Sequence, residues 1–197
     1  MYQHHDNIRD LLTHLLDKVS KDVVAEPHLI PVTGEQMALK SANIKDESRL
    51  DIKAKGFWQR GQTAFFDIRT THVNALSQMT KNTSTIFRSH EQAKKREYLQ
   101  RVLDIEHGAF TPLVFGTNGG MGEECHRFVS HLSNKLAEKT NDSYSSVCTW
   151  LRTRLSMEIT RAVILCVRGS RVPFRKQTDN ITDFELMNME CRNIINE

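Results

Sequence analysis

The chain has 197 residues, a formal charge of +3 at pH 7 and four cysteines. This length can bury one hydrophobic core, so we expect one domain with short additions, and the mild positive charge neither requires nor excludes nucleic acid. No apolar run approaches the roughly 20 residues of a membrane helix, and the N-terminus lacks the apolar segment of a signal peptide. The widely spaced cysteines contain no C-x-x-C pair, which is typical of a reducing compartment. We therefore expect an intracellular protein without disulfides or a membrane span.

The N-terminal part predicts a helix followed by a short strand. Apolar residues recur at helical spacing from Ile8 to Val19, after a possible cap at Asp6. The run over residues 22–25 reads as a short strand that ends before Pro27. The polar, turn-rich stretch over residues 28–48 is expected to cross the protein surface.

Two further strands are predicted over residues 49–55 and 63–70. They are joined by residues 56–62, a loop bracketed by glycines, which is typical of a hairpin. If the hairpin is symmetric about Gln59, residues whose numbers sum to 118 lie opposite each other. This register is decisive, because each of the two strands carries an aspartate.

In that register, Asp51 lies opposite Asp67, and Arg49 lies opposite Arg69. Directly opposed residues have Cβ atoms roughly 5 Å apart. Two carboxylates that close repel each other unless a proton or a cation lies between them, so the pattern predicts a divalent metal. The alternative is that each aspartate pairs with Arg49, Arg69 or Lys53 and has no chemical role.

The C-terminal half predicts mainly helices. In chain order, we expect a long helix over 82–107 capped by Asn82 or Thr83, a strand over 110–115 and a glycine-rich turn over 116–122. The next helix is expected to bury Cys125, Phe128, Val129, Leu132 and Leu136, and a final long helix from Ser143 is expected to bury Val147, Trp150, Leu151, Leu155, Ile159, Val163 and Cys166. A polar tail with a weak helix over 182–195 follows. Pro112 inside the strand predicts an edge position or an irregular start.

The resulting order, α-β-β-β-α-β-α-α, predicts a mixed sheet covered by helices. With an aspartate on each of the second and third strands, the chain resembles the PD-(D/E)XK, or restriction-endonuclease-like, superfamily, whose core has the order αβββαβ. The resemblance covers Asp6 to about Phe115. It implies an α/β (α+β) domain over 1–169, with the core over about 6–115, a helical extension over 121–169 and a polar tail over 170–197.

More closely, the chain is similar to reading frames associated with mobile elements of invertebrate genomes. The similarity lies in the runs Asn7-Ile8-Arg9-Asp10, Arg49-Leu50-Asp51-Ile52, Gly56-Phe57-Trp58, Phe65-Phe66-Asp67-Ile68-Arg69 and Phe110-Thr111-Pro112-Leu113-Val114-Phe115. Retrotransposons with a restriction-like endonuclease are a more distant comparison. The resemblance implies an endonuclease domain that uses Mg²⁺ or Mn²⁺ to cut DNA, in the nucleus if the target is host DNA. A larger polymerase-containing polyprotein is one expected context.

The resemblance assigns Asp51 and Asp67 to the metal. Leu50 stands where the family has a proline, and Arg69 stands at the position of the catalytic lysine. Arginine keeps the charge and can hold a phosphate, but it does not readily release a proton. In some branches of the superfamily the lysine comes from the following helix, where Lys94 and Lys95 are candidates.

The 82–107 helix has an apolar stripe, defined by Phe87, Tyr98 and Val102, that Glu91 and Lys94 interrupt. Charged residues on an inward stripe indicate a polar pocket beneath the helix. The alternative is an ordinary Glu91–Lys94 surface pair at the edge of the stripe.

Other candidates carry weaker signals. Glu26 is a possible third acidic ligand or a solvated turn residue, and Asp10 is expected to face water. The segment from Thr149 to Lys176 is strongly basic and forms either a phosphate-binding surface or a solvated helix face; its arginines are Arg152, Arg154, Arg161, Arg168, Arg171 and Arg175. The run Lys94-Lys95-Arg96 is a second basic cluster. The 116–122 turn lacks the Lys-Ser/Thr of a P-loop.

Three functions therefore remain open at this level. The first is a metal-dependent endonuclease that cuts DNA. The second is a nuclease-like fold that has lost catalysis and binds nucleic acid or supports assembly, an alternative that Arg69 keeps open. The third is a protein-interaction domain without enzymatic activity.

Overall fold

The computed structural model describes residues 3–30 and 49–168, and the side chains of residues 5–30 and 49–164 within them. The predicted surface segment over 31–48 and the weak helix over 182–195 lie outside the described residues. The described residues up to Val167 form one compact unit. Its elements are α1 Gln3–Val19, β1 Lys21–Ala25, β2 Ile52–Lys55, β3 Thr63–Thr71, the short 3-10 helix η1 Leu76–Gln78, α2 Thr83–Asp104, β4 Ala109–Gly116, α3 Glu123–Thr140 and α4 Tyr144–Arg168. Apart from η1, this order matches the prediction.

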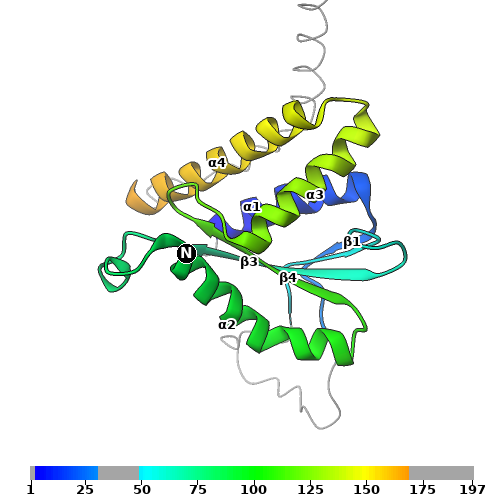
Figure 1. Ribbon diagram of the computed structural model, residues 1–197, viewed down its shortest axis with the longest axis horizontal. Helices are drawn as coiled ribbons and strands as arrows, with labels where there is room; N and C mark the ends of the chain where they lie inside the picture. The colour runs from blue at the N-terminus through cyan, green and yellow to red at the C-terminus, as the bar shows by residue number, and fades with distance from the viewer. Residues whose placement is uncertain (1–2, 31–48, 169–197) are drawn as a thin grey trace, which may run out of the picture. The chain divides into compact units, whose positions relative to one another are not determined.

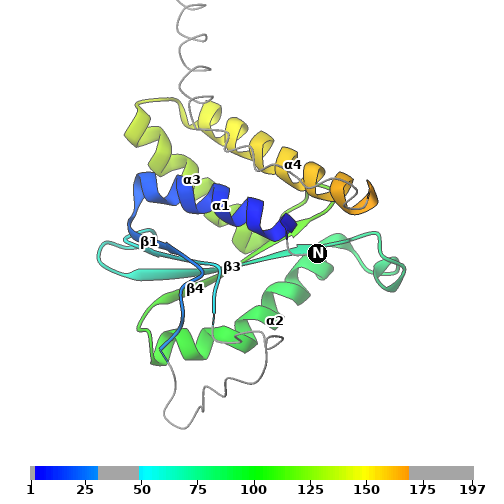
Figure 2. The same ribbon diagram turned by 180° about the vertical axis from the view of Figure 1, so that it is seen from behind.

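The described strands form one mixed sheet in the order β1-β2-β3-β4. The β1–β2 and β2–β3 pairs are antiparallel, whereas β3 and β4 are parallel. Figures 1 and 2 show α2 on one face of the sheet and α1, α3 and α4 on the other, which is an α/β arrangement. Pro112 lies on β4, an edge strand as predicted, because an edge position tolerates the missing N–H group.

The β2–β3 hairpin has the predicted register. Ile52 pairs with Phe66 and Lys55 pairs with Thr63, so the hairpin is symmetric about Gln59. Both loop glycines have positive φ, at Gly56 (81°) and Gly61 (84°), which glycine adopts without steric cost.

The predicted start of β2 is wrong. The strand begins at Ile52, and the segment before it pairs toward β1, where Leu50 N donates to Pro27 O at 3.2 Å and Arg49 forms a bridge with His28. Arg49 therefore does not lie opposite Arg69. Asp51 does not continue the register either, because its N–H group donates at 3.1 Å to the carbonyl oxygen of Phe66, which is already the partner of Ile52. The predicted pairing of Asp51 with Asp67 is therefore not formed as a ladder pair.

Alternation along β3 separates an apolar face from a polar one. On the side of α1 and α3, the ring of Phe66 packs 5.3 Å from Phe57 and 5.0 Å from Phe128, centroid to centroid. The predicted apolar residues of α1 and α3 are buried on this side, among them Ile8, Leu12, Leu15, Leu16, Cys125, Phe128, Val129, Leu132 and Leu136. Within the described residues, no helix has the length and apolar character needed to cross a membrane.

On the other face, α2 covers two separate apolar clusters. One contains Leu29, Leu50, Phe65, Tyr98, Val102 and Phe110, and the other contains Val73, Ile86, Phe87 and Val114. Asn82 caps α2, because its Oδ1 accepts a hydrogen bond from Ser84 N at 3.1 Å. Along α2, Lys94 lies between the residues of the two clusters. The apolar stripe is thus interrupted by polar groups directly above the polar residues of β3.

Candidate functional site

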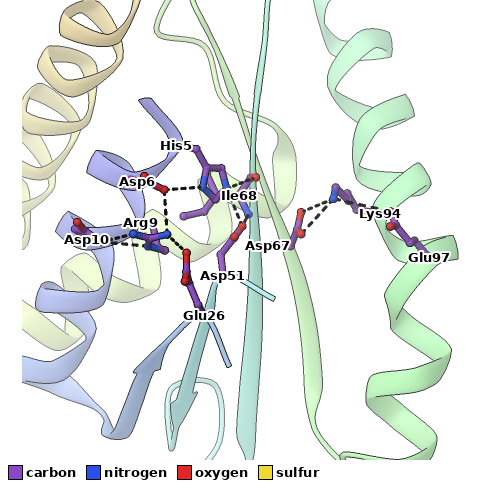
Figure 3. Close-up of polar contacts among 10 residues, drawn as sticks. All are labelled: His5, Asp6, Arg9, Asp10, Glu26, Asp51, Asp67, Ile68, Lys94 and Glu97. Carbon is purple, nitrogen blue, oxygen red and sulfur yellow. Dashed lines mark hydrogen bonds and ion pairs between the residues drawn. The ribbon is translucent and has the colours of Figure 1, made fainter. Parts of the chain in front are cut away.

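Asp67 is the buried charged residue at the centre of the sheet. Only 5 % of its surface is exposed, and it lies on the face of β3 that α2 covers. The Lys94 ammonium of α2 lies 3.2 Å from each carboxylate oxygen of Asp67 (Figure 3). Lys94 also lies 3.8 Å from Glu97 and 5.2 Å above the centre of the Tyr98 ring. The lysine predicted from the following helix therefore reaches the aspartate of the third strand.

The Asp67 carboxylate is incompletely satisfied. Its Oδ2 atom is buried and has no hydrogen-bond partner, since Lys94 lies at ion-pair distance from this oxygen without hydrogen-bond geometry. Burial, and then the charge of Asp51, raise the pKa of Asp67 from 3.8 to about 6, although Lys94 and His5 act in the opposite direction. Ionised Asp67 therefore costs folding free energy at neutral pH, and an added cation would offset this cost.

Asp51 occupies the place where β2 separates from β3. Its Oδ2 atom accepts a hydrogen bond from Ile68 N at 2.5 Å and lies 2.9 Å from His5 Nε2. The same imidazole nitrogen lies 3.0 Å from Ile68 O. Side chains thus contact the two backbone groups of Ile68 at the point where the β2–β3 ladder ends. Burial lowers the pKa of His5, but the hydrogen bond and the charge of Asp51 outweigh burial and raise it.

The two aspartates are close enough for the charge of Asp51 to act on Asp67, but they contact different helices. Figure 3 shows Asp51 turned toward His5 of α1 and Asp67 turned toward Lys94 of α2. The alternative in which each aspartate pairs with Arg49, Arg69 or Lys53 is not observed. Among the described residues, Asp51 Oδ1 accepts no hydrogen bond and Asp67 Oδ2 accepts none. Each carboxylate therefore has one oxygen that accepts no hydrogen bond from the described residues.

Arg69 lies beside this pair, and among the described residues it has no counter-ion. It lies two residues beyond Asp67, on the same face of β3, and is half-buried. Within residues 3–30 and 49–168, no carboxylate lies at ion-pair distance from its guanidinium. Burial, and then the charges of Arg69 and Lys81, lower the pKa of His90, which lies 3.0 Å from Thr71 Oγ1. This end of β3 is therefore electropositive.

Lys95 and Glu91 contact the start of α3 and not Asp67. Lys95 pairs with Glu124 at 2.5 Å, and Glu91 Oε1 accepts a hydrogen bond from Glu124 N at 3.0 Å, at the start of α3. A Glu91–Lys94 surface pair is not formed, so that alternative was wrong. Both side chains point inward from α2, as the interrupted apolar stripe indicated, but to different targets, because Lys94 reaches β3 and Glu91 reaches α3.

Glu26 belongs to a separate ion-pair network at the end of β1. Its carboxylate pairs with Arg9 through one oxygen and with Arg49 through the other, at 2.9 Å for Arg49. Arg9 also pairs with Asp6 at 3.0 Å and with Asp10 at 2.9 Å (Figure 3). The structure therefore does not bring Glu26 or Asp10 to Asp67.

A two-carboxylate magnesium site fits this geometry better than a three-ligand site. In the part of the chain that the structure describes, no group of three His, Cys, Asp or Glu residues could hold a metal. Mg²⁺ often uses one or two carboxylates and completes its shell with water and substrate oxygens. Asp51 and Asp67, with Oδ2 of Asp67 buried and unpartnered, fit that requirement.

The basic residues of α4 lie away from this pair. Arg152 is exposed, whereas Arg154 and Arg161 lie 4.0 Å and 3.5 Å from the buried Glu158. Figures 1 and 2 place α4 on the face of the sheet opposite to α2, the helix that contains Lys94. The side chain of Arg168 and the whole of Arg171 lie outside the described residues.

His5 is the site residue that sequence reasoning missed. It contacts Asp51, which is 46 positions away along the chain, and no local pattern marks it. His131 lies away from this site, where its Nε2 is 2.7 Å from Phe57 O and its ring stacks on Trp58. The 116–122 segment is a tight turn, with Gly119 at φ 82° and a hydrogen bond from Gly116 N to Gly120 O at 2.7 Å.

Comparison of the chain with models of known protein families gives no match, and comparison with curated protein sequences gives none either.

Proposed function

We propose that this chain is a metal-dependent, restriction-like endonuclease domain that hydrolyses DNA phosphodiester bonds, as one module of a mobile-element protein that acts in the nucleus. The observation that carries the proposal is the buried Asp67 carboxylate, which contacts Lys94 and retains one unpartnered oxygen. Arg69, which has no counter-ion among the described residues, follows on the same face. A buried acid, an amine and a cation that has no counter-ion within residues 3–30 and 49–168 lie on neighbouring elements, and together they form a set that phosphodiester hydrolysis can use.

The proposed roles follow from what each side chain can reach. Asp51 and Asp67 would hold Mg²⁺ or Mn²⁺, which when bound lowers the pKa of water and neutralises phosphate charge. Lys94 contacts Asp67 and would orient both that carboxylate and the attacking water. Arg69 would bind a non-bridging phosphate oxygen, since its guanidinium is planar and permanently charged.

A second candidate is a nuclease-like fold that binds nucleic acid without cutting it. One observation favours it: both aspartates already have protein partners. Asp51 is held by Ile68 N and His5, and Asp67 is held by Lys94. If these contacts are purely structural, the fold keeps its polar residues for stability while DNA binds through its cations.

The test is cleavage of supercoiled, single-stranded and branched DNA in Mg²⁺ or Mn²⁺, with Asp67→Ala as the inactive control. We expect cutting that needs the metal and falls at least about a thousandfold in the variant, because the metal loses its buried ligand. Thermal unfolding of both proteins shows whether the variant is folded.

Metal-dependent cutting that persists in folded Asp67→Ala would reject the assignment of this site. If the wild-type chain cuts none of the substrates but binds DNA with a steep salt dependence, the binding module is the correct function.

A further inference from the structure

The segment between β3 and α2 has an unusual combination of exposed apolar residues and positive charge. Leu76 is 89 % exposed and Met79 is 69 % exposed, both in the connection that contains η1. None of the residues from Ile68 to His90 is acidic, whereas Arg69, Lys81 and Arg88 are basic. Apolar side chains of this size normally pack inside the protein, so their display next to cations indicates a ligand that is both anionic and able to accept apolar groups.

The segment holds this shape through backbone hydrogen bonds. Gln78 N donates to Ala75 O at 2.7 Å, and Lys81 N donates to Gln78 O at 2.9 Å. At its base, His72 Nδ1 lies 2.9 Å from Thr117 Oγ1 of the β4–α3 turn. Leu76 and Met79 are therefore displayed on a turn that is already formed before any ligand binds.

The position of the segment links it to the candidate active site. It follows the C-terminal end of β3, and Figures 1 and 2 show it extending beyond the end of the sheet. Thr71, the last residue of β3, is four residues beyond Asp67, which corresponds to about 13 Å along a strand. That length equals roughly four base steps of duplex DNA.

We propose that this segment is a duplex-binding wedge: Leu76 and Met79 insert between base pairs from the minor groove while Lys81 and Arg88 bind the flanking phosphates. Leucine and methionine are among the residues that unstack base steps in this way. An anionic membrane surface fits less well, because interfacial binding uses a broad apolar helix face, and this segment offers two separated side chains. The inference rests on the proposed function for its choice of DNA as ligand.

The experiment measures DNA unstacking without cleavage. The full chain is titrated, in EDTA, into duplexes that carry 2-aminopurine at successive positions, whose fluorescence rises when the base unstacks. We expect a rise at one step for the wild-type protein. The double variant Leu76→Ser/Met79→Ser should lose the rise and bind about tenfold more weakly, and Met157→Ser, which changes an exposed apolar residue of α4, should behave like the wild type. Lys81→Gln/Arg88→Gln should keep the rise but reduce the salt slope by about two.

The proposal is overturned if the wild type binds the duplex without a fluorescence rise, or if the serine variant matches the wild type. It is also overturned if Leu76 and Met79 support binding only to vesicles of phosphatidylcholine and phosphatidylserine. Cleavage is scored separately with metal present. Cleavage without unstacking supports the nuclease function and rejects the wedge. Unstacking without cleavage in any metal rejects the nuclease function and supports the wedge.

Discussion

Asp67 and Glu26 are two carboxylates near the same sheet that differ in burial and in the number of their ion-pair partners. Glu26 is partly exposed, with 38 % of its side chain accessible, and both its oxygens pair with arginines. Asp67 is buried, contacts one lysine and keeps an unpartnered oxygen, with its pKa raised to about 6. Glu26 is satisfied by the protein alone, whereas Asp67 is not. Incomplete satisfaction of a buried charge is costly, and it is a physical mark of a functional site.

The largest expected effect is on the rate of DNA cleavage, and it should differ between variants of the two adjacent lysines of α2. Lys94→Met removes the amine beside Asp67, and we expect metal-dependent DNA cleavage to fall about a hundredfold, since the acid and the attacking water lose their positioning group. Lys95→Met is the matched control, because Lys95 pairs with Glu124 instead. The measurement is the initial rate of nicking. Equal losses in the two variants would contradict a specific role for Lys94.

The next effect concerns stability and its dependence on pH. The pKa of Asp67 is raised from 3.8 to about 6, so the folded state binds the proton more tightly than the unfolded state does. The contribution of Asp67 to the free energy of unfolding is therefore highest below about pH 4. It falls as the pH rises to about 6 and stays low above that. Asp67→Asn should raise the free energy of unfolding by about 3 kcal/mol at pH 7.

Urea unfolding of wild type and Asp67→Asn at pH 4 and pH 7 checks this prediction. The difference between the two proteins should vanish at the lower pH, where Asp67 is protonated. A variant that is less stable than the wild type at pH 7 would show that the Lys94 contact outweighs the cost of burial. In that case Asp67 would be a structural residue like Glu26.

The smallest effect is expected at Glu26. Glu26→Gln weakens pairs with Arg9 and Arg49 at a partly exposed position, so we expect a loss of only about 0.5–1 kcal/mol and cleavage within about twofold of wild type. The same urea and nicking assays measure both quantities. A large loss of cleavage in a stable Glu26→Gln protein would place Glu26 in the active site and remove the contrast with Asp67.

Much of the fold follows from local patterns. Helical spacing of apolar residues in α1 and α3, alternation in β3 and the glycine-bracketed loop predicted the element order, the buried faces and the hairpin register, because each depends on residues close together in sequence. The start of β2 was misplaced, because Arg49 and Leu50 pair with the β1 side of the sheet rather than with β3. A single strand pattern does not reveal which neighbour it pairs with.

The site itself was only partly determined by sequence. Asp51, Asp67 and Arg69 could be placed on the hairpin, and Lys94 and Lys95 could be named as alternatives, since both lie within one turn of the same helix. Only tertiary structure decided that Lys94 contacts Asp67, that His5 contacts Asp51, and that two arginines hold Glu26. Sequence sets which face a side chain occupies, through the periods of helix and strand. Which partner it meets there depends on how separate elements dock, and the contacts involved join residues up to 46 positions apart.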